Sequence, residues 1–150
     1  MNSTNNLLLT KHEKSLIWLF RIWLLCFVSV FALFFKFSGQ FLEITNQISA
    51  KYFPGLLPIP TESNPFWMPL VFSLMVTLIA ISYLVQKNIR KNLNLIPVFL
   101  ASKLGTSIFF FVYFFTAQKS FAFLFGSISD AFMFLITYFL YQRVKPNGSK

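Results

Sequence analysis

Four long, continuously apolar runs constrain this chain more than any other feature of its sequence. They cover residues 15–35, 66–85, 96–116 and 121–141. Each has about 20 residues, the length an α-helix needs to cross about 30 Å of hydrocarbon. Strands of a membrane barrel would instead alternate between apolar and polar residues over about 10 positions. The sequence therefore predicts an all-α protein, a four-transmembrane-helix bundle that occupies residues 1–150 as a single domain.

The basic residues lie mainly on one side of this four-span arrangement. The side with both termini receives Lys11, Lys14, Lys87, Arg90, Lys91, Arg143, Lys145 and Lys150, and the other side receives Lys36, Lys51 and Lys119. Because cytoplasmic loops carry the excess of lysine and arginine, we expect both termini in the cytoplasm and residues 38–65 outside. A net charge of +9 placed in this way suits anionic lipid headgroups rather than nucleic acid. The expected location is a cytoplasmic-type membrane, either a plasma membrane or an inner membrane.

The external loop, residues 38–65, contains one segment with helical periodicity. Apolar residues recur at helical spacing from Phe41 to Tyr52, with polar residues on the other faces. This pattern predicts a short interfacial amphipathic helix. The proline-rich stretch 54–60 that follows cannot be helical throughout. The loop is either an interfacial connector or a lid over a substrate opening, and the sequence leaves both possibilities open.

Small and polar residues mark one face of each predicted span. Spans pack in lipid through small residues and polar contacts, since no hydrophobic force drives them together. The polar residues that we expect to face the bundle are Arg21, Ser29, Lys36, Ser73, Thr77, Ser102, Thr106 and Thr137. For Arg21 and Lys36, near the ends of the first span, anchoring to headgroups competes with a ligand role. The 22 phenylalanines fill the remaining faces and are expected to point mainly toward lipid.

Two charges, Lys103 and Asp130, lie well inside the third and fourth runs. A charge near the bilayer centre costs about 3 kcal/mol on insertion scales. Each charge therefore requires a partner of opposite charge, contact with water or a functional role. Residues 117–120 form a short connection that makes the two helices neighbours. Side chains tilt toward the N-terminus of their own helix, however, so Lys103 has to turn against this tilt to meet Asp130.

Three arrangements of these charges are therefore open. They are a direct Lys103–Asp130 pair, a lysine that reaches the headgroups alone, and contact with water or with another partner. A direct pair would be a candidate structural or transport site.

The sequence contains no recognisable catalytic or cofactor motif. His12 is the only histidine and lies outside the spans, Asp130 is the only aspartate, and Cys26 is the only cysteine. These counts exclude paired-aspartate and serine–histidine protease sites, dithiol chemistry and clustered metal ligands. No nucleotide-binding glycine motif occurs. We expect no metal, no cofactor and no catalytic residue, although a lipid enzyme that uses Asp130 as an acid stays open.

Two functions of different classes are consistent with a sequence that has no catalytic or cofactor motif. The first is a non-enzymatic subunit or assembly partner of a membrane complex, favoured by the missing catalytic chemistry and the polar faces. The alternative is a small oligomeric transporter or channel whose pathway uses Lys103 and Asp130. In both cases the expected partners are the lipid bilayer and either another membrane protein or further copies of the chain.

Overall fold

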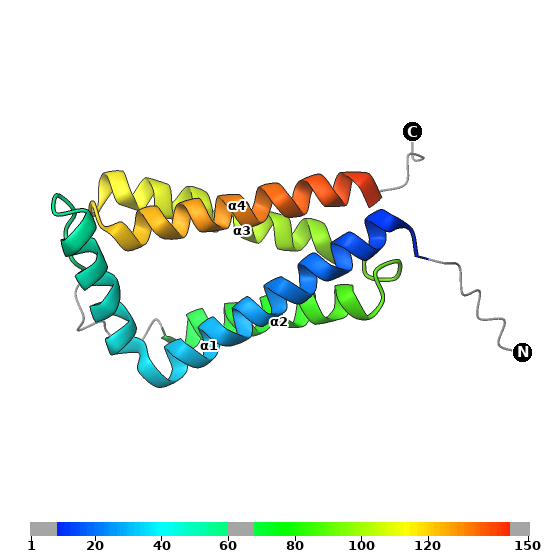
Figure 1. Cartoon of the computed structure of the whole chain (residues 1–150), viewed down its shortest axis with the longest axis horizontal. Helices are drawn as coiled ribbons and strands as arrows, with labels where there is room; N and C mark the ends of the chain where they lie inside the picture. The colour runs from blue at the N-terminus through cyan, green and yellow to red at the C-terminus, as the bar shows by residue number, and fades with distance from the viewer. Residues whose placement is uncertain (1–8, 60–67, 145–150) are drawn as a thin grey trace, which may run out of the picture.

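The computed structural model describes residues 9–59 and 68–144, and most of them are helical (Figure 1). The helices are α1 (Lys11–Tyr52), α2 (Met68–Lys87), α3 (Leu95–Thr116) and α4 (Phe121–Val144). Within the described residues, four stretches are long and apolar enough to cross a membrane: Lys11–Phe37 and the whole of α2, α3 and α4. The predicted all-α, four-span membrane bundle is confirmed. The start of the second predicted span, residues 66 and 67, lies outside the described residues.

Helix α1 begins at a capped end and bends in its second half. Thr10 Oγ1 accepts a hydrogen bond from the backbone N–H of Glu13, and the Glu13 carboxylate accepts one from the backbone N–H of Thr10. This reciprocal capping box fixes the start of the helix. Phe37 has non-helical dihedral angles, φ −135° and ψ 33°, at the bend. The following residues, 38–52, form the helix predicted from Phe41 to Tyr52, but as a continuation of α1; we call them the arm.

The arm lies across one end of the bundle, between the membrane span of α1 and the α3–α4 connection (Figure 1). The Asn46 side chain accepts from the N–H of Ile59 at 2.9 Å and donates to the Ile59 carbonyl at 2.8 Å. The N–H of Leu57 donates to the Lys119 carbonyl at 2.8 Å. These bonds tie the described part of the external loop to the arm and to the α3–α4 connection. Residues 60–65 of the predicted loop lie outside the described residues.

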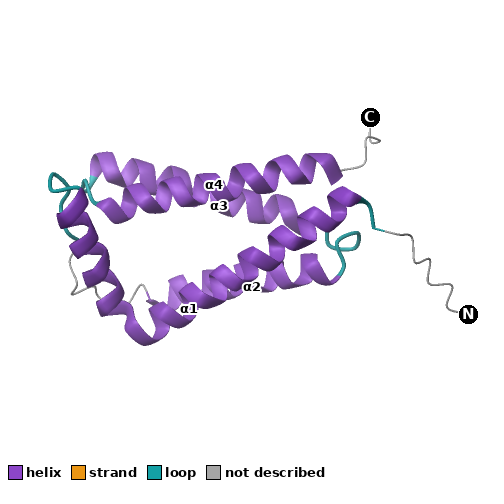
Figure 2. Cartoon of the chain, in the orientation of Figure 1, coloured by secondary structure: helices purple, strands orange, loops and turns teal. Residues whose placement is uncertain are grey.

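The helices are arranged as two hairpin-like pairs, with α1 against α2 and α3 against α4. Figure 2 shows the pairs close together where α1 begins and α4 ends, and farther apart at the end that the arm crosses. We call these the terminal end and the arm end of the bundle. At the terminal end α1 contacts α4, and α2 contacts α3.

Buried apolar side chains gather at the terminal end. They come from α1 (Leu16, Leu19, Phe20, Trp23 and Phe27), from α2 (Leu78, Ile81 and Val85), from the α2–α3 connection (Ile89) and from α3 (Ile96, Phe99 and Leu100). No described side chain from Val28 to Ile48 in α1, or from Met68 to Thr77 in α2, is buried. The arm-end halves of α1 and α2 therefore contribute nothing to the core.

An ion pair between Arg90 and Glu13 joins α1 to the α2–α3 connection at the terminal end. The Arg90 guanidinium, in the α2–α3 connection, donates to both carboxylate oxygens of Glu13, from Nε at 2.7 Å and from Nη2 at 3.0 Å. Bidentate pairs of this kind are stronger than single neutral hydrogen bonds. The hydrogen bond to Glu13 raises the pKa of Arg90 above its ordinary value. The capped start of α1 is thus joined to the connection between the next two helices.

The inward face of α1 differs from the polar stripe expected from the sequence. Arg21, Ser29 and Lys36 are all exposed. At 100° per residue they lie on the side of the helix away from Trp23, whose face is buried. The expectation was wrong because large rings, rather than small residues, fill the space between α1 and its neighbours in the core.

The inward face of α2 needs the same correction. Ser73 and Thr77 are exposed, whereas Ser82 and the apolar residues at helical spacing from it are buried. Thr77 Oγ1 donates to the Ser73 carbonyl at 2.9 Å. A hydroxyl satisfied within its own helix can face lipid without a neighbouring helix, so its polarity does not predict an inward position.

Candidate intramembrane polar site

The two charges inside the predicted spans meet in the structure. Lys103 Nζ lies 2.9 Å from Asp130 Oδ1, and both side chains are largely buried. The pair joins α3 to α4, which the short connection from Ala117 to Ser120 holds side by side. Of the three arrangements open from the sequence, the structure therefore has the direct pair, with the lysine turned to the carboxylate rather than to the headgroups.

Thr106 is the second donor to the Asp130 carboxylate. Its hydroxyl contacts Asp130 Oδ2 and also lies 3.0 Å from the Ser102 carbonyl and 3.2 Å from the Lys103 carbonyl. A hydroxyl has one proton to donate, and a carboxylate is the stronger acceptor. We therefore assign that proton to Asp130, so that each carboxylate oxygen has its own donor. Thr106 and Ser102 are half-buried.

The lysine has a second contact, across the bundle to α1. Its ammonium lies 4.8 Å from the centroid of the Phe27 ring. A cation over an aromatic face is attracted by the ring's electron density, and the attraction is larger where water is excluded. Lys103 is therefore held by a carboxylate from α4 and a ring from α1, and it connects three helices.

Two serines close to the pair bind each other's backbone. Ser107 Oγ donates to the Ser127 carbonyl, and Ser127 Oγ donates to the Ser107 carbonyl, both at 2.9 Å. The sequence analysis did not single out either residue. Their spacing gives the missing signal: Ser107 is four residues after Lys103 and Ser127 is three residues before Asp130, so each lies on the same helix face as its charge.

Trp23 and Thr137 form the polar contact between α1 and α4. The indole N–H of Trp23 donates to Thr137 Oγ1 at 3.0 Å, and Thr137 is fully buried. Trp23 is not among the bundle-facing residues named from the sequence. A buried indole needs an acceptor, and the threonine on the facing helix supplies it.

The other polar residues named from the sequence lie apart from this cluster. The Arg21 guanidinium is 5.0 Å from the Trp18 ring centroid, and Lys36 Nζ is 5.3 Å from the centroid of Phe37. Both cations are exposed near the ends of the first span, where they can reach headgroups. They therefore take no part in the Lys103–Asp130 contacts, and neither do the exposed residues Ser29, Ser73 and Thr77.

The ion pair between Lys103 and Asp130 limits the chemistry that the site can perform. The ion pair is neutral overall, and both carboxylate oxygens already accept a hydrogen bond. A proton or a cation that binds Asp130 would therefore compete with Lys103 and Thr106 for the carboxylate oxygens. In the described ranges, no three His, Cys, Asp or Glu side chains come together as metal ligands would.

Comparison of the chain with protein-family models, with curated proteins and with solved structures finds no match. The fold by itself defines the class, which is that of multi-pass integral membrane proteins with four spanning helices.

Proposed function

We propose that this chain is a non-enzymatic subunit or assembly partner of a membrane complex. The observation that carries the proposal is the exposed stripe of α1, formed by Arg21, Ser29, Ala32 and Lys36. Small and polar residues in membrane helices are typical of helix–helix contacts, because they permit close approach and interhelical hydrogen bonds. In this chain the stripe points away from the core, and Ser29 forms no hydrogen bond to a described residue.

The uneven burial of the bundle supports the same proposal. No described side chain from Val28 to Ile48 or from Met68 to Thr77 is buried, whereas the Lys103–Asp130 site is already satisfied inside the chain. The surface available for new polar and close-packed contacts is therefore on α1 and α2. A helix of another membrane protein is the partner that such a surface fits.

The test is the native mass of the tagged full chain after gentle solubilisation from its own membrane. A defined complex with a different protein is expected, and Ala32→Trp should abolish it by placing a large ring in the stripe. Ile128→Trp is the matched control, because Ile128 is an exposed residue of α4. Failure to recover any stoichiometric partner, or equal loss with both variants, would contradict the proposal.

The alternative is an oligomeric transporter or channel, and the Lys103–Asp130 pair is the feature that favours it. Intramembrane ion pairs occur along proton and ion pathways. This function requires Lys103 to separate from Asp130 during each cycle. The corresponding measurement is pH-dependent flux into liposomes that contain the purified chain. Flux that disappears in Asp130→Asn, together with a homo-oligomeric native mass, would favour transport over the subunit function.

We further propose that both termini are cytoplasmic and that the membrane is a plasma or inner membrane. The support for this orientation is the excess of lysine and arginine at the terminal end.

A further inference from the structure

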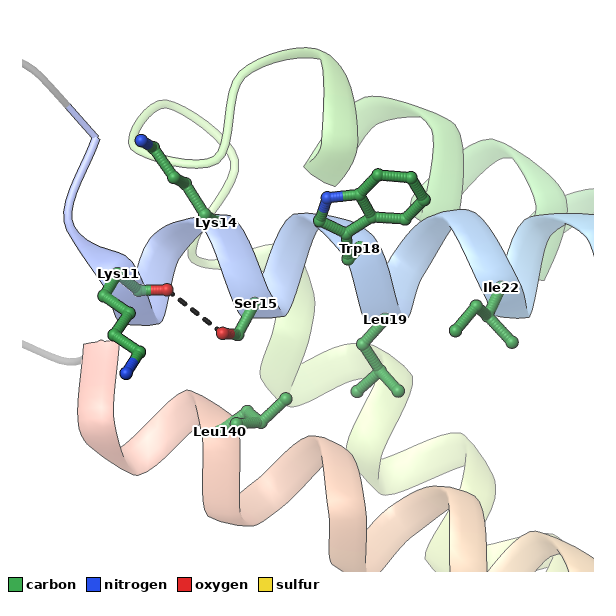
Figure 3. A pocket seen from close by; sticks show the side chains of 7 residues that line it. All are labelled: Lys11, Lys14, Ser15, Trp18, Leu19, Ile22 and Leu140. Carbon is green, nitrogen blue, oxygen red and sulfur yellow. Dashed lines mark hydrogen bonds between the residues drawn. The ribbon is translucent and has the colours of Figure 1, made fainter.

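A shallow pocket of about 550 Å³ lies on the surface of the terminal end, between α1 and α4 (Figure 3). Lys11 and Lys14 stand at its polar edge, and Leu19, Ile22 and Leu140 form its apolar part. The pocket is separate from the Lys103–Asp130 site and from the arm-end surfaces of α1 and α2.

The polar edge of the pocket carries positive charge that no carboxylate of a described residue pairs with. Lys11 and Lys14 are both exposed, and neither forms an ion pair with a described residue. Glu13 lies between them in sequence, but both of its oxygens are engaged by Arg90. The Glu13 charge is thus directed away from the pocket, and the two ammonium groups remain available to an anion.

Trp18 extends the donor set toward the apolar part. Its side chain is 62% exposed, and its indole nitrogen lies on the side of the ring nearer to Lys14 (Figure 3). Ser15 offers no further donor, because its hydroxyl donates to the Lys11 carbonyl at 3.1 Å. In Figure 3 the Lys14 and Trp18 side chains extend to one side of α1 and the Lys11 side chain to the other, so the flexible lysine side chains have to turn toward an anion at this edge.

Along α1 the lysines of the pocket come before its apolar residues Leu19 and Ile22, in the order of headgroup and acyl chain in a lipid molecule. The span Lys11–Phe37 has 27 residues, so its length of about 40 Å exceeds the hydrocarbon thickness of about 30 Å. Its first turns consequently lie at headgroup depth. Ile22 is eight residues beyond Lys14, which places it about 12 Å deeper along the helix, at the depth of acyl chains.

From these positions we infer that the pocket binds an anionic phospholipid, with the phosphate at the edge lined by Lys11 and Lys14 and an acyl chain along Leu19 and Ile22. Free phosphate would share the first contact, but the apolar part of the pocket suits a lipid. Tryptophan at this depth is typical of the membrane interface, where one edge of the ring is wet and the other is apolar. The inference is independent of the proposed subunit function.

The experiment is native mass spectrometry of the full chain, released from micelles that contain equal amounts of phosphatidylglycerol and phosphatidylcholine with the same acyl chains. The wild-type chain is expected to retain phosphatidylglycerol preferentially. Each lysine near a lipid surface accounts for about a fivefold change in affinity. Lys11→Gln with Lys14→Gln should therefore weaken phosphatidylglycerol retention about 25-fold and leave phosphatidylcholine retention unchanged.

The matched control is Lys87→Gln with Lys91→Gln, which removes the same charge from the same end of the bundle outside the pocket. All four lysines are exposed, so neither double variant is expected to affect folding. The inference would be overturned if both double variants lost the same amount of phosphatidylglycerol retention. It would also be overturned if the wild type showed no preference for phosphatidylglycerol over phosphatidylcholine. A further arm adds excess inorganic phosphate to the wild type: retention of the lipid supports the inference, and its displacement would assign the pocket to a free anion instead.

Discussion

At the scale of single residues, the Asp130 carboxylate accepts hydrogen bonds on both of its oxygens inside the predicted spans. Lys103 donates to one of its oxygens and Thr106 to the other, while Phe27 faces the lysine. Removing one member of a buried ion pair leaves an uncompensated charge, and this costs more than the intact pair contributes. These side chains should therefore behave as one coupled unit.

This coupling predicts an unequal response to single and double substitution. Asp130→Leu alone should lower the free energy of unfolding by about 3 kcal/mol, because Lys103 is left buried and unpaired. The double variant Lys103→Met, Asp130→Leu should show a smaller decrease in the free energy of unfolding, since both charges are removed together. Thermal unfolding of the wild type, both single variants and the double variant measures the coupling, which we expect at about 1–3 kcal/mol. Additive losses would show that the two side chains do not interact energetically.

At the scale of helices, α3 and α4 approach each other through small residues near the Ser107–Ser127 bonds. A Cβ atom added at Gly126 would lie 2.8 Å and 2.9 Å from two ring carbons of Phe110. The same addition at Gly105 would meet nothing within 4 Å. One glycine is therefore required for the contact between α3 and α4, and the other is not.

The two glycines provide a matched pair of substitutions. Gly126→Ala should destabilise the protein by about 1 kcal/mol, because the Phe110 ring has to move out of its packed position. Gly105→Ala should cause no loss, since its methyl group enters open space and alanine is the better helix former. The midpoints of thermal unfolding of both variants in the same detergent test this difference. If Gly105→Ala were the more damaging of the two, the α3–α4 interface described here would be wrong.

At the scale of the whole molecule, two helix pairs are joined at both ends by different means. The terminal end has the apolar core and the Glu13–Arg90 ion pair, and the arm end has the arm and its hydrogen bonds near Asn46 and Lys119. The terminal end also carries most of the basic residues. By the positive-inside rule, this excess supports the orientation that we propose, with both termini in the cytoplasm.

That orientation predicts which cysteine probes can be labelled from outside the cell. In a Cys26→Ser background, a membrane-impermeant maleimide should label Gln40→Cys, in the arm, on intact cells. Asn94→Cys, in the α2–α3 connection, should react only after permeabilisation. Both positions are exposed, so any difference reports the side of the membrane. Labelling of Asn94→Cys on intact cells would reverse the assigned orientation.

The four spans could be predicted from the sequence because the rule that defines them is local. In hydrocarbon each backbone N–H and C=O must be satisfied within its own helix, so about 20 consecutive apolar residues suffice to predict a span. The external helix was predictable for a similar reason, through the periodicity from Phe41 to Tyr52. Its continuity with α1 was not, because the bend depends on the backbone angles of one residue, Phe37.

The sequence could not predict which faces of α1 and α2 point inward. A helix in lipid is apolar on its inner and outer sides alike, so hydrophobicity does not distinguish the two. Small and polar residues then suggested Arg21 and Ser73 as inward positions, whereas the structure buries Trp23 on α1 and Ser82 on α2. Ring sizes and the hydroxyl bonds within each helix decided the outcome, and these appear only when the helices are packed.

By itself, the sequence determined that the protein is a four-span helical membrane protein, since apolar length and charge placement act along the chain. It also placed Lys103 and Asp130 on neighbouring helices through the short connection between them. Only the tertiary structure decided that these two residues pair, that Thr106 and Phe27 complete their surroundings, and that α1 turns its polar stripe outward. Those outcomes depend on the rotation of each helix about its own axis, which is set by contacts between residues far apart in the sequence.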